Sequence, residues 1–323
     1  MTLGGLVLVT GASGFVGGHL LPALAGMRVR LALRAESANR LPGFEPVVVG
    51  DLDRSTEWTP ALADVQTVVH MAAHVHVMKP TADDRQRFYE VNALGTERLA
   101  IAAAECGVKR FIFLSSIKVN GESTTDRPFN AMDAPHPEDD YGLSKCEGEQ
   151  RLFRVAARTG MSVVVLRPTL VYGIGVRGNF LKLMSWVSKG VPLPFGSIAN
   201  ARSILSVWNL CDLVVRVVQA REAASGVFLV SDGVDLSTPE LIRRIAGAMR
   251  RPARLLPVPA QLLKLAGAMT SIGPSIQRLC SSLTVDIALT REAFDWTPAV
   301  PVDEALDRTA QWYLSGFERP TLG

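Results

Sequence analysis

Cysteine is scarce in this chain. The 323 residues include four cysteines, none of them in a CxxC pair or at a spacing from histidine that is typical of zinc ligands. They are Cys106, Cys146, Cys211 and Cys280. The sequence therefore predicts neither a disulfide framework nor a zinc site, and it favours a reducing compartment such as the cytoplasm.

Long apolar runs and clusters of like charge are also missing. No stretch of about 18 residues is continuously apolar, so we expect no membrane-spanning helix. The N-terminus lacks the charged segment, apolar segment and small-residue cleavage site of a secretory signal peptide, so we expect a cytoplasmic protein. Lys and Arg number 34 against 31 Asp and Glu, a net charge of +3 without a basic run, which does not predict a nucleic-acid partner. The most apolar stretch is Leu255 to Ile276, interrupted by prolines; it predicts a buried helix and, as a second interpretation, a surface for a membrane or a lipid-linked substrate.

The first half alternates β-branched runs with helical patterns, which is typical of βαβ units around a parallel sheet. The expected strands are 6–10, 29–33, 46–50, 67–71, 110–115 and 162–167. The expected helices are 15–25, 84–106, 141–159, 238–250 and 302–314. We therefore predict an α/β fold, in which a Rossmann-type doubly wound parallel sheet spans 1–168, with returning segments near 203–235. The rest of 169–323 should form a smaller, mixed α/β substrate lobe.

A glycine-rich turn follows the first expected strand. Gly11, Gly14 and Gly17 frame the sequence GASGFVG, which also contains Ser13, Phe15 and Val16. The first glycine permits a tight turn, the second admits a pyrophosphate, and the third lets the helix pack on the strand. The unpaired N–H groups of the helix N-terminus would bind the phosphates of a dinucleotide.

The GxxGxxG spacing resembles the extended short-chain dehydrogenase/reductase superfamily, in particular its NAD-dependent epimerases, dehydratases and reductases of nucleotide sugars. The resemblance continues through several later segments. It implies cofactor contacts for Asp51, Leu52, Met71, Ala72, Ala73, Asn92, Ser115 and Pro168.

The residue after the second expected strand is Arg34, where relatives that prefer NAD carry an acid. A guanidinium there could pair with a 2′-phosphate, so we expect NADP(H) to be favoured, with NAD(H) as the alternative if Glu36 or Asp51 binds the ribose.

Tyr141 and Lys145 lie four residues apart, on one face of an expected helix. A neighbouring ammonium and a positive nicotinamide would lower the pKa of the phenol and suit it to proton transfer. The resemblance assigns the catalytic triad to Ser116, Tyr141 and Lys145; it also implies that Lys145 binds the cofactor ribose. An ordinary surface pair on a helix is the structural alternative.

Substrate contacts are implied by the resemblance alone. Asn179 and Arg202 match positions that bind a nucleotide diphosphate, and His74, Lys118 and Asn120 would lie on the substrate side. The family's R-x-G-D signature is absent, which leaves Arg278 or Arg291 as substitutes. His70, His74 and His76 recur after a strand, but no carboxylate or cysteine at ligand spacing joins them, so we expect no metal.

We expect hydride transfer at C4 of a UDP-linked, or lipid-diphosphate-linked, sugar. Arg34 favours reduction of a UDP-4-keto-6-deoxy-hexosamine in surface-polysaccharide (O-antigen) biosynthesis. The alternatives are a 4-epimerase for UDP-hexose or UDP-N-acetylhexosamine and a non-catalytic NAD(P)-binding regulator. The resemblance also implies a homodimer.

Overall fold

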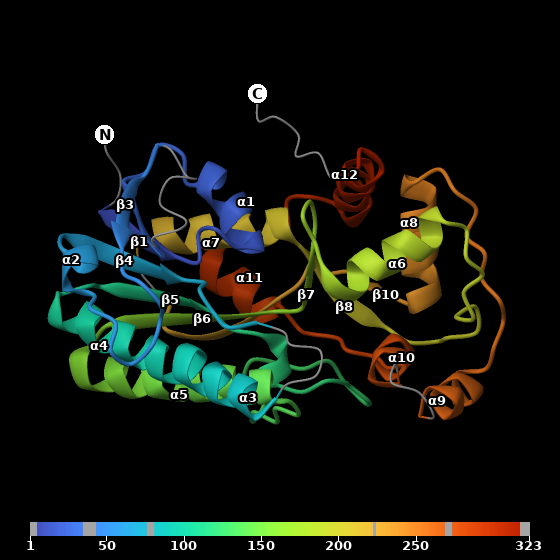
Figure 1. The fold of residues 1–323 in the computed structure, drawn as a ribbon, viewed down its shortest axis with the longest axis horizontal. Helices are drawn as coiled ribbons and strands as arrows, with labels where there is room; N and C mark the ends of the chain where they lie inside the picture. The colour runs from blue at the N-terminus through green and yellow to red at the C-terminus, as the bar shows by residue number, and fades with distance from the viewer. Residues whose placement is uncertain (1–4, 35–42, 76–80, 222–223, 269–272, 317–323) are drawn as a thin grey trace.

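A computed structural model describes residues 5–34, 43–75, 81–221, 224–268 and 273–316, and Figure 1 shows its two lobes. The larger lobe contains a seven-stranded sheet in the order β3-β2-β1-β4-β5-β6-β9, and every pairing in it is parallel. Its strands are β1 (Leu6–Thr10), β2 (Val29–Leu33), β3 (Glu45–Val48), β4 (Val65–His70), β5 (Arg110–Leu114), β6 (Ser162–Pro168) and β9 (Gly226–Val230). This architecture confirms the predicted Rossmann-type α/β fold.

Helices cover both faces of the large sheet (Figure 1). One face carries α1 (Phe15–Ala23), α7 (Val207–Gln219) and α11 (Ala288–Phe294), and the other carries α4 (Thr96–Glu105) and α5 (Asp140–Thr159). The short helix α2 (Thr59–Leu62) packs beside α4. Apart from the exposed edge strand β3, the strands are buried on both faces, which explains their nearly continuous apolar sequences.

The predicted helix over 84–106 is three segments. α3 (Ala82–Phe88) leads into a π-helical segment, η2 (Tyr89–Gly95), before α4 begins. A capping box between Thr81 and Asp84 begins α3. The wider turn carries Asn92, whose side chain bonds outside the helix, and π-bulges of this kind are frequent at functional sites.

The smaller lobe is built on a three-stranded sheet. β7 (Leu170–Tyr172) runs parallel to β8 (Arg202–Ser206), and β10 (Asp235–Leu236) runs antiparallel to β8. α6 (Gly178–Ser188), α8 (Thr238–Ala248) and α12 (Val302–Leu314) share its hydrophobic core. The chain returns to the large lobe through α7 and β9 and again through α11. We expected the returning segment near 203–235 to include β8, but β8 belongs to the small sheet.

The buried helix predicted over 255–276 is wrong. The chain instead forms α9 (Ala260–Ala268) and α10 (Gly273–Cys280). Leu263 is buried in the small core, but Leu262 is 57% exposed and Leu265 is 65% exposed. No helix among the described residues is long and apolar enough to cross a bilayer.

Candidate active site

The glycine turn lies where β1 ends and α1 begins. Gly11 has φ +75°, and a Cβ there would lie 2.6 Å from the backbone nitrogen of Ala72, so only glycine fits between the ends of β1 and β4. A Cβ on Gly17 would lie 2.4 Å from the Gly11 carbonyl oxygen, which explains how α1 packs so closely on the turn. A Cβ on Gly14 would lie 3.2 Å from the same Gly11 carbonyl oxygen and near nothing else. The first turn of α1 contains no acidic residue.

These features fit the pyrophosphate of a dinucleotide. The N-terminus of α1 carries partial positive charge, and Ser13 is exposed beside it while Phe15 and Val16 are half-buried. Met71, Ala72 and Ala73 continue from β4 next to Gly11, with the Ala72 N–H donating to the Thr10 hydroxyl at 3.2 Å. Pro168 is buried at the end of β6.

Arg34 and Asp51 lie side by side at the ends of β2 and β3. The guanidinium and the carboxylate are 3.8 Å apart, and both side chains are largely exposed. Leu52 is half-buried next to Asp51. Glu36, the other candidate for the ribose, lies outside the described residues.

Tyr141 and Lys145 project from the first turns of α5. Asp139 begins this helix by accepting a hydrogen bond from the Gly142 N–H at 2.7 Å. Lys145 is 1% exposed, with its Nζ 4.0 Å from the centre of the Phe113 ring on β5. The lysine therefore points toward the strand end that leads into Ser116.

Ser116 begins the short 3-10 helix η3 (Ile117–Val119) and accepts a hydrogen bond from the Lys118 N–H at 3.2 Å. This segment abuts α5, since a Cβ on Gly142 would lie 2.8 Å from the Lys118 carbonyl oxygen. The structure thus brings the elements that carry the three predicted catalytic residues together beside the ends of β4 and β5.

The electrostatics differ from the expected lowering of the phenol pKa. Burial, together with the Asp139 carboxylate, raises the pKa of Tyr141 to about 12. Burial lowers the pKa of Lys145 to about 7, partly opposed by Glu149. In the protein by itself burial and Asp139 therefore oppose phenolate, and the positive charge of a nicotinamide bound nearby would favour it.

Three predicted contacts are corrected because their side chains are buried and bonded to the protein. Ser115 donates its hydroxyl proton to Glu149, so that proton is not available to a cofactor. Asn120 is 2% exposed and accepts from Arg167 at 2.9 Å, which removes it from the substrate side.

Asn92 is the third corrected residue. It bonds both backbone groups of His74, at 2.8 and 3.0 Å, and donates to the Ser144 hydroxyl at 3.0 Å. Ser144 in turn donates to the Tyr141 carbonyl oxygen. Asn92 is therefore a positioning residue that ties the segment after β4 to the helix of Tyr141.

The predicted arginine clamp, Arg202, is anchored to the protein through one nitrogen. Nη1 of Arg202 donates to the carbonyl oxygens of Arg278 and Ser281, at 2.7 and 3.0 Å, and so holds the end of α10. These bonds occupy one nitrogen of the guanidinium and leave its Nε and Nη2 edge for a bidentate phosphate contact, so the diphosphate contact stays a prediction. Arg278 is a second candidate in the same region, because its guanidinium meets Glu122 at 3.3 Å and Glu122 in turn accepts a hydrogen bond from Lys118 at 2.7 Å.

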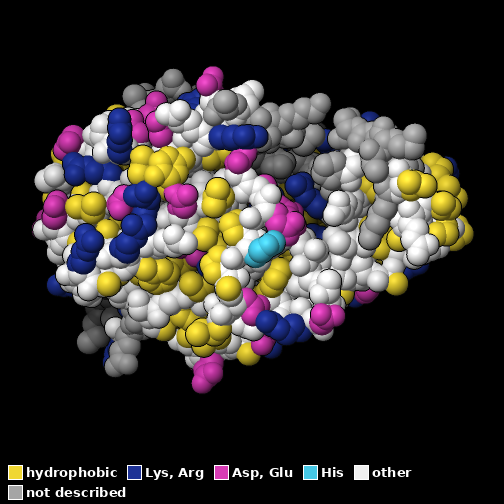
Figure 2. Space-filling model, turned by 90° about the horizontal axis from the view of Figure 1, so that it is seen from below, with side chains coloured by type: hydrophobic (Ala, Val, Ile, Leu, Met, Phe, Trp, Pro, Cys, Tyr) yellow, Lys and Arg dark blue, Asp and Glu magenta, His cyan; other side chains and the backbone are white. Residues whose placement is uncertain are grey.

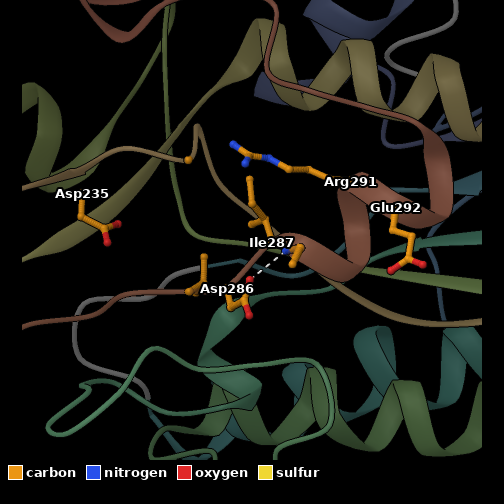
Figure 3. A pocket seen from close by; sticks show the side chains of 8 residues that line it. Asp235, Asp286, Ile287, Arg291 and Glu292 are labelled. Carbon is orange, nitrogen blue, oxygen red and sulfur yellow. Dashed lines mark hydrogen bonds between the residues drawn. The ribbon is translucent and has the colours of Figure 1, made fainter.

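Figure 3 shows that the other substitute, Arg291, reaches from α11 across a different cavity. That cavity has a volume of about 570 Å³, and Arg291 is the one predicted residue in its lining. It is lined by Gly233, Asp235, Val285, Asp286, Ile287, Ala288, Arg291 and Glu292.

The remaining predicted substrate residues, Asn179 and His74, are at least partly exposed. Asn179 is exposed in the first turn of α6. The His74 ring packs against Phe88 with centroids 4.9 Å apart, and its Nε2 lies 3.9 Å from an Asp84 oxygen. His70 bonds Thr10 and Thr96 in the interior, His76 lies outside the described residues, and the described residues contain no group of metal ligands.

Comparison with known proteins agrees with this geometry. The chain is 46% identical over 97% of both chains to a Vibrio cholerae protein named UDP-glucose 4-epimerase. It is 28% identical, over 95% of its length and 94% of the other, to an Escherichia coli O157:H7 protein named N-acetyl-alpha-D-glucosaminyl-diphospho-ditrans,octacis-undecaprenol 4-epimerase. Among solved structures, MoeE5 in complex with UDP-glucose and NAD superposes with a TM-score of 0.76 at 26% identity, covering 97% of this chain and 99% of the other.

The sequence model described as "NAD dependent epimerase/dehydratase family" matches residues 7–230. With the doubly wound sheet, the glycine turn and the Tyr141 helix beside the strand ends, the chain belongs to the NAD-dependent epimerase/dehydratase family of the extended short-chain dehydrogenases/reductases.

Proposed function

We propose that this protein is a UDP-sugar 4-epimerase rather than the 4-keto-reductase that Arg34 led us to expect. The observation that carries the proposal is the 46% identity, over nearly the whole of both chains, to a protein named UDP-glucose 4-epimerase. Both reactions need hydride transfer at C4, so the site geometry alone is compatible with either. An epimerase must in addition keep its cofactor and let a keto-sugar turn over within the site.

The chain's own residues would move the proton. Nicotinamide bound beyond the glycine turn would supply the hydride acceptor and donor. Tyr141 would take the proton from the C4 hydroxyl and later return it, and Ser116 would hold that oxygen by a hydrogen bond. Lys145 would bind the ribose and help to stabilise the phenolate, and Arg278 would face the diphosphate.

The pair formed by Arg34 and Asp51 supports NAD(H) as the cofactor. A carboxylate 3.8 Å from the guanidinium repels a 2′-phosphate but accepts a hydrogen bond from a 2′-hydroxyl. Dissociation constants of NADH and NADPH for the wild type and Arg34→Ala test this. A wild-type preference for NADPH that Arg34→Ala abolishes would restore the original expectation.

The decisive experiment uses the purified wild-type protein without added cofactor. We expect NAD to copurify with it and UDP-glucose or UDP-N-acetylglucosamine to be converted to its C4 epimer. Tyr141→Phe should lose roughly 10²–10⁴-fold in turnover while still binding NAD. Turnover that requires a 4-keto substrate and consumes NAD(P)H stoichiometrically would establish the reductase instead. No turnover with any UDP-sugar or polyprenyl-diphosphate sugar would favour the non-catalytic regulator.

A lipid-linked diphosphate sugar is the second candidate substrate. The exposed leucines of α9 favour it, since α9 is the helix that precedes α10, which carries Arg278. Comparing turnover of a UDP-sugar with that of the same sugar on a polyprenyl diphosphate separates the two.

A further inference from the structure

The charges of this chain are divided unevenly between its lobes. Two segments of the smaller lobe, 169–211 and 241–285, contain eleven Lys and Arg residues and no Asp or Glu. Because the whole chain carries +3, all other residues together carry −8. Positive charge is thus concentrated in these two segments, although no basic run marks them in the sequence.

Several of these basic side chains are exposed at the outer end of that lobe. Figure 1 shows the chain running from the end of α8 down this end to α9. Arg250, Arg251 and Arg254 are exposed on this stretch. The Arg254 guanidinium lies against Gly190, with 3.8 Å between its Cζ and a Cβ placed on that glycine, which brings it next to the exposed Lys189.

Apolar side chains are exposed on the same stretch. Leu256 is 49% exposed, and its backbone is fixed by hydrogen bonds to Leu193 and Gly196. Leu263 anchors α9 in the core, which leaves Leu262 and Leu265 pointing outward. Figure 2 shows hydrophobic side chains gathered at this end of the molecule.

We propose that this end face, defined by Arg250, Arg251, Arg254, Leu256, Leu262 and Leu265, docks on the surface of a bilayer that contains anionic lipid. Exposed leucines beside basic residues match the two contributions to interfacial binding, burial of apolar area and attraction to negative headgroups. The absence of any acid from residues 241–285 removes repulsion from the bilayer along the whole stretch. The proposal does not depend on the substrate, because docking needs no sugar.

The experiment is sedimentation of the full-length protein with phosphatidylcholine vesicles, with and without one-third phosphatidylglycerol, at low and high salt. We expect binding to the anionic vesicles only, weakened by salt. The variant R250Q/R251Q/R254Q should lose about 100-fold in partition coefficient. L262E/L265E should also lose binding.

The matched control is R54Q/R87Q/R158Q, which removes the same charge from exposed positions of the larger lobe. It should bind as the wild type does. Thermal unfolding and UDP-sugar turnover without vesicles confirm that each variant is folded, so failure of docking and failure of the proposed reaction are read separately. The proposal would be overturned if the wild type did not bind vesicles, or if the control variant lost as much binding as R250Q/R251Q/R254Q. It would also be overturned if the protein did not bind vesicles but self-associated in a way that L262E/L265E abolished.

Discussion

Two polar networks converge on α5, and they differ in burial. Beneath the strand ends, Arg167 and Glu149 are each 4% exposed and bond one another through two pairs of atoms, with Ser115 and Asn120 completing the network. At the mouth of the site, Lys118 bonds both Glu122 and Asp139, and these side chains are 19–35% exposed.

The difference in burial separates a network that stabilises the fold from one that adjusts the pKa of Tyr141. The buried network connects β5, α5 and β6, so it fixes the catalytic elements relative to one another. The half-exposed network connects η3, the first residues of α5 and, through Arg278, the smaller lobe. Its charges lie close to the residue that titrates, so it acts on the pKa of Tyr141 more than on the stability of the fold.

The largest effect is expected from breaking the buried pair. Glu149→Ala leaves the Arg167 guanidinium without its partner carboxylate in the interior and should lower the free energy of unfolding by about 3–5 kcal/mol. Urea denaturation measures this. The double variant E149L/R167M, which removes both charges, should be more stable than Glu149→Ala, and a loss within about 1 kcal/mol for the single variant would contradict the role given to the network.

A second large effect concerns pH. Burial, with a contribution from Lys145, lowers the pKa of His70 from 6.5 to about 3. Below pH 6.5 the unfolded chain therefore binds a proton that the folded protein does not, and stability falls as the pH decreases. Between pH 6.5 and about 4.5 the wild type should lose roughly 2 kcal/mol more than His70→Gln does. Equal pH slopes for the two proteins would show that His70 is not the cause.

These interior contacts mark the limit of what the sequence could predict. The glycine turn and the strands around it have local patterns, and β1 and β2 match their predicted bounds. Asn120 and Ser115 occupy motif positions that suggested ligands, but their bonding depends on Arg167 and Glu149, which are distant in sequence. The prediction of a buried helix over 255–276 was wrong because hydrophobic periodicity indicates an apolar helix face but does not indicate whether the lobe is large enough to cover that face.

Lys118→Met should change stability little and activity measurably. The pair with Asp139 is partly exposed, so its loss should cost no more than about 1 kcal/mol of unfolding free energy. Without the ammonium, the Asp139 and Glu122 carboxylates raise the pKa of Tyr141 further. The acid limb of the pH profile of kcat/KM should therefore move to higher pH by up to about one unit. An unchanged profile with a large loss of stability would assign Lys118 a purely structural role.

Asp139→Asn gives the smallest effect and the opposite sign. Burial alone would raise the pKa of Asp139, but hydrogen bonds from Lys118 and the Gly142 N–H outweigh it and hold that pKa below its usual range, so the carboxylate is charged at neutral pH. Asparagine keeps the cap of α5 and removes the charge. The acid limb of kcat/KM should move to lower pH by about half a unit, because the anion that raises the pKa of Tyr141 is gone. In the double variant K118M/D139N the two shifts should largely cancel; additive shifts in one direction would show that the network acts by moving α5 rather than through its charges.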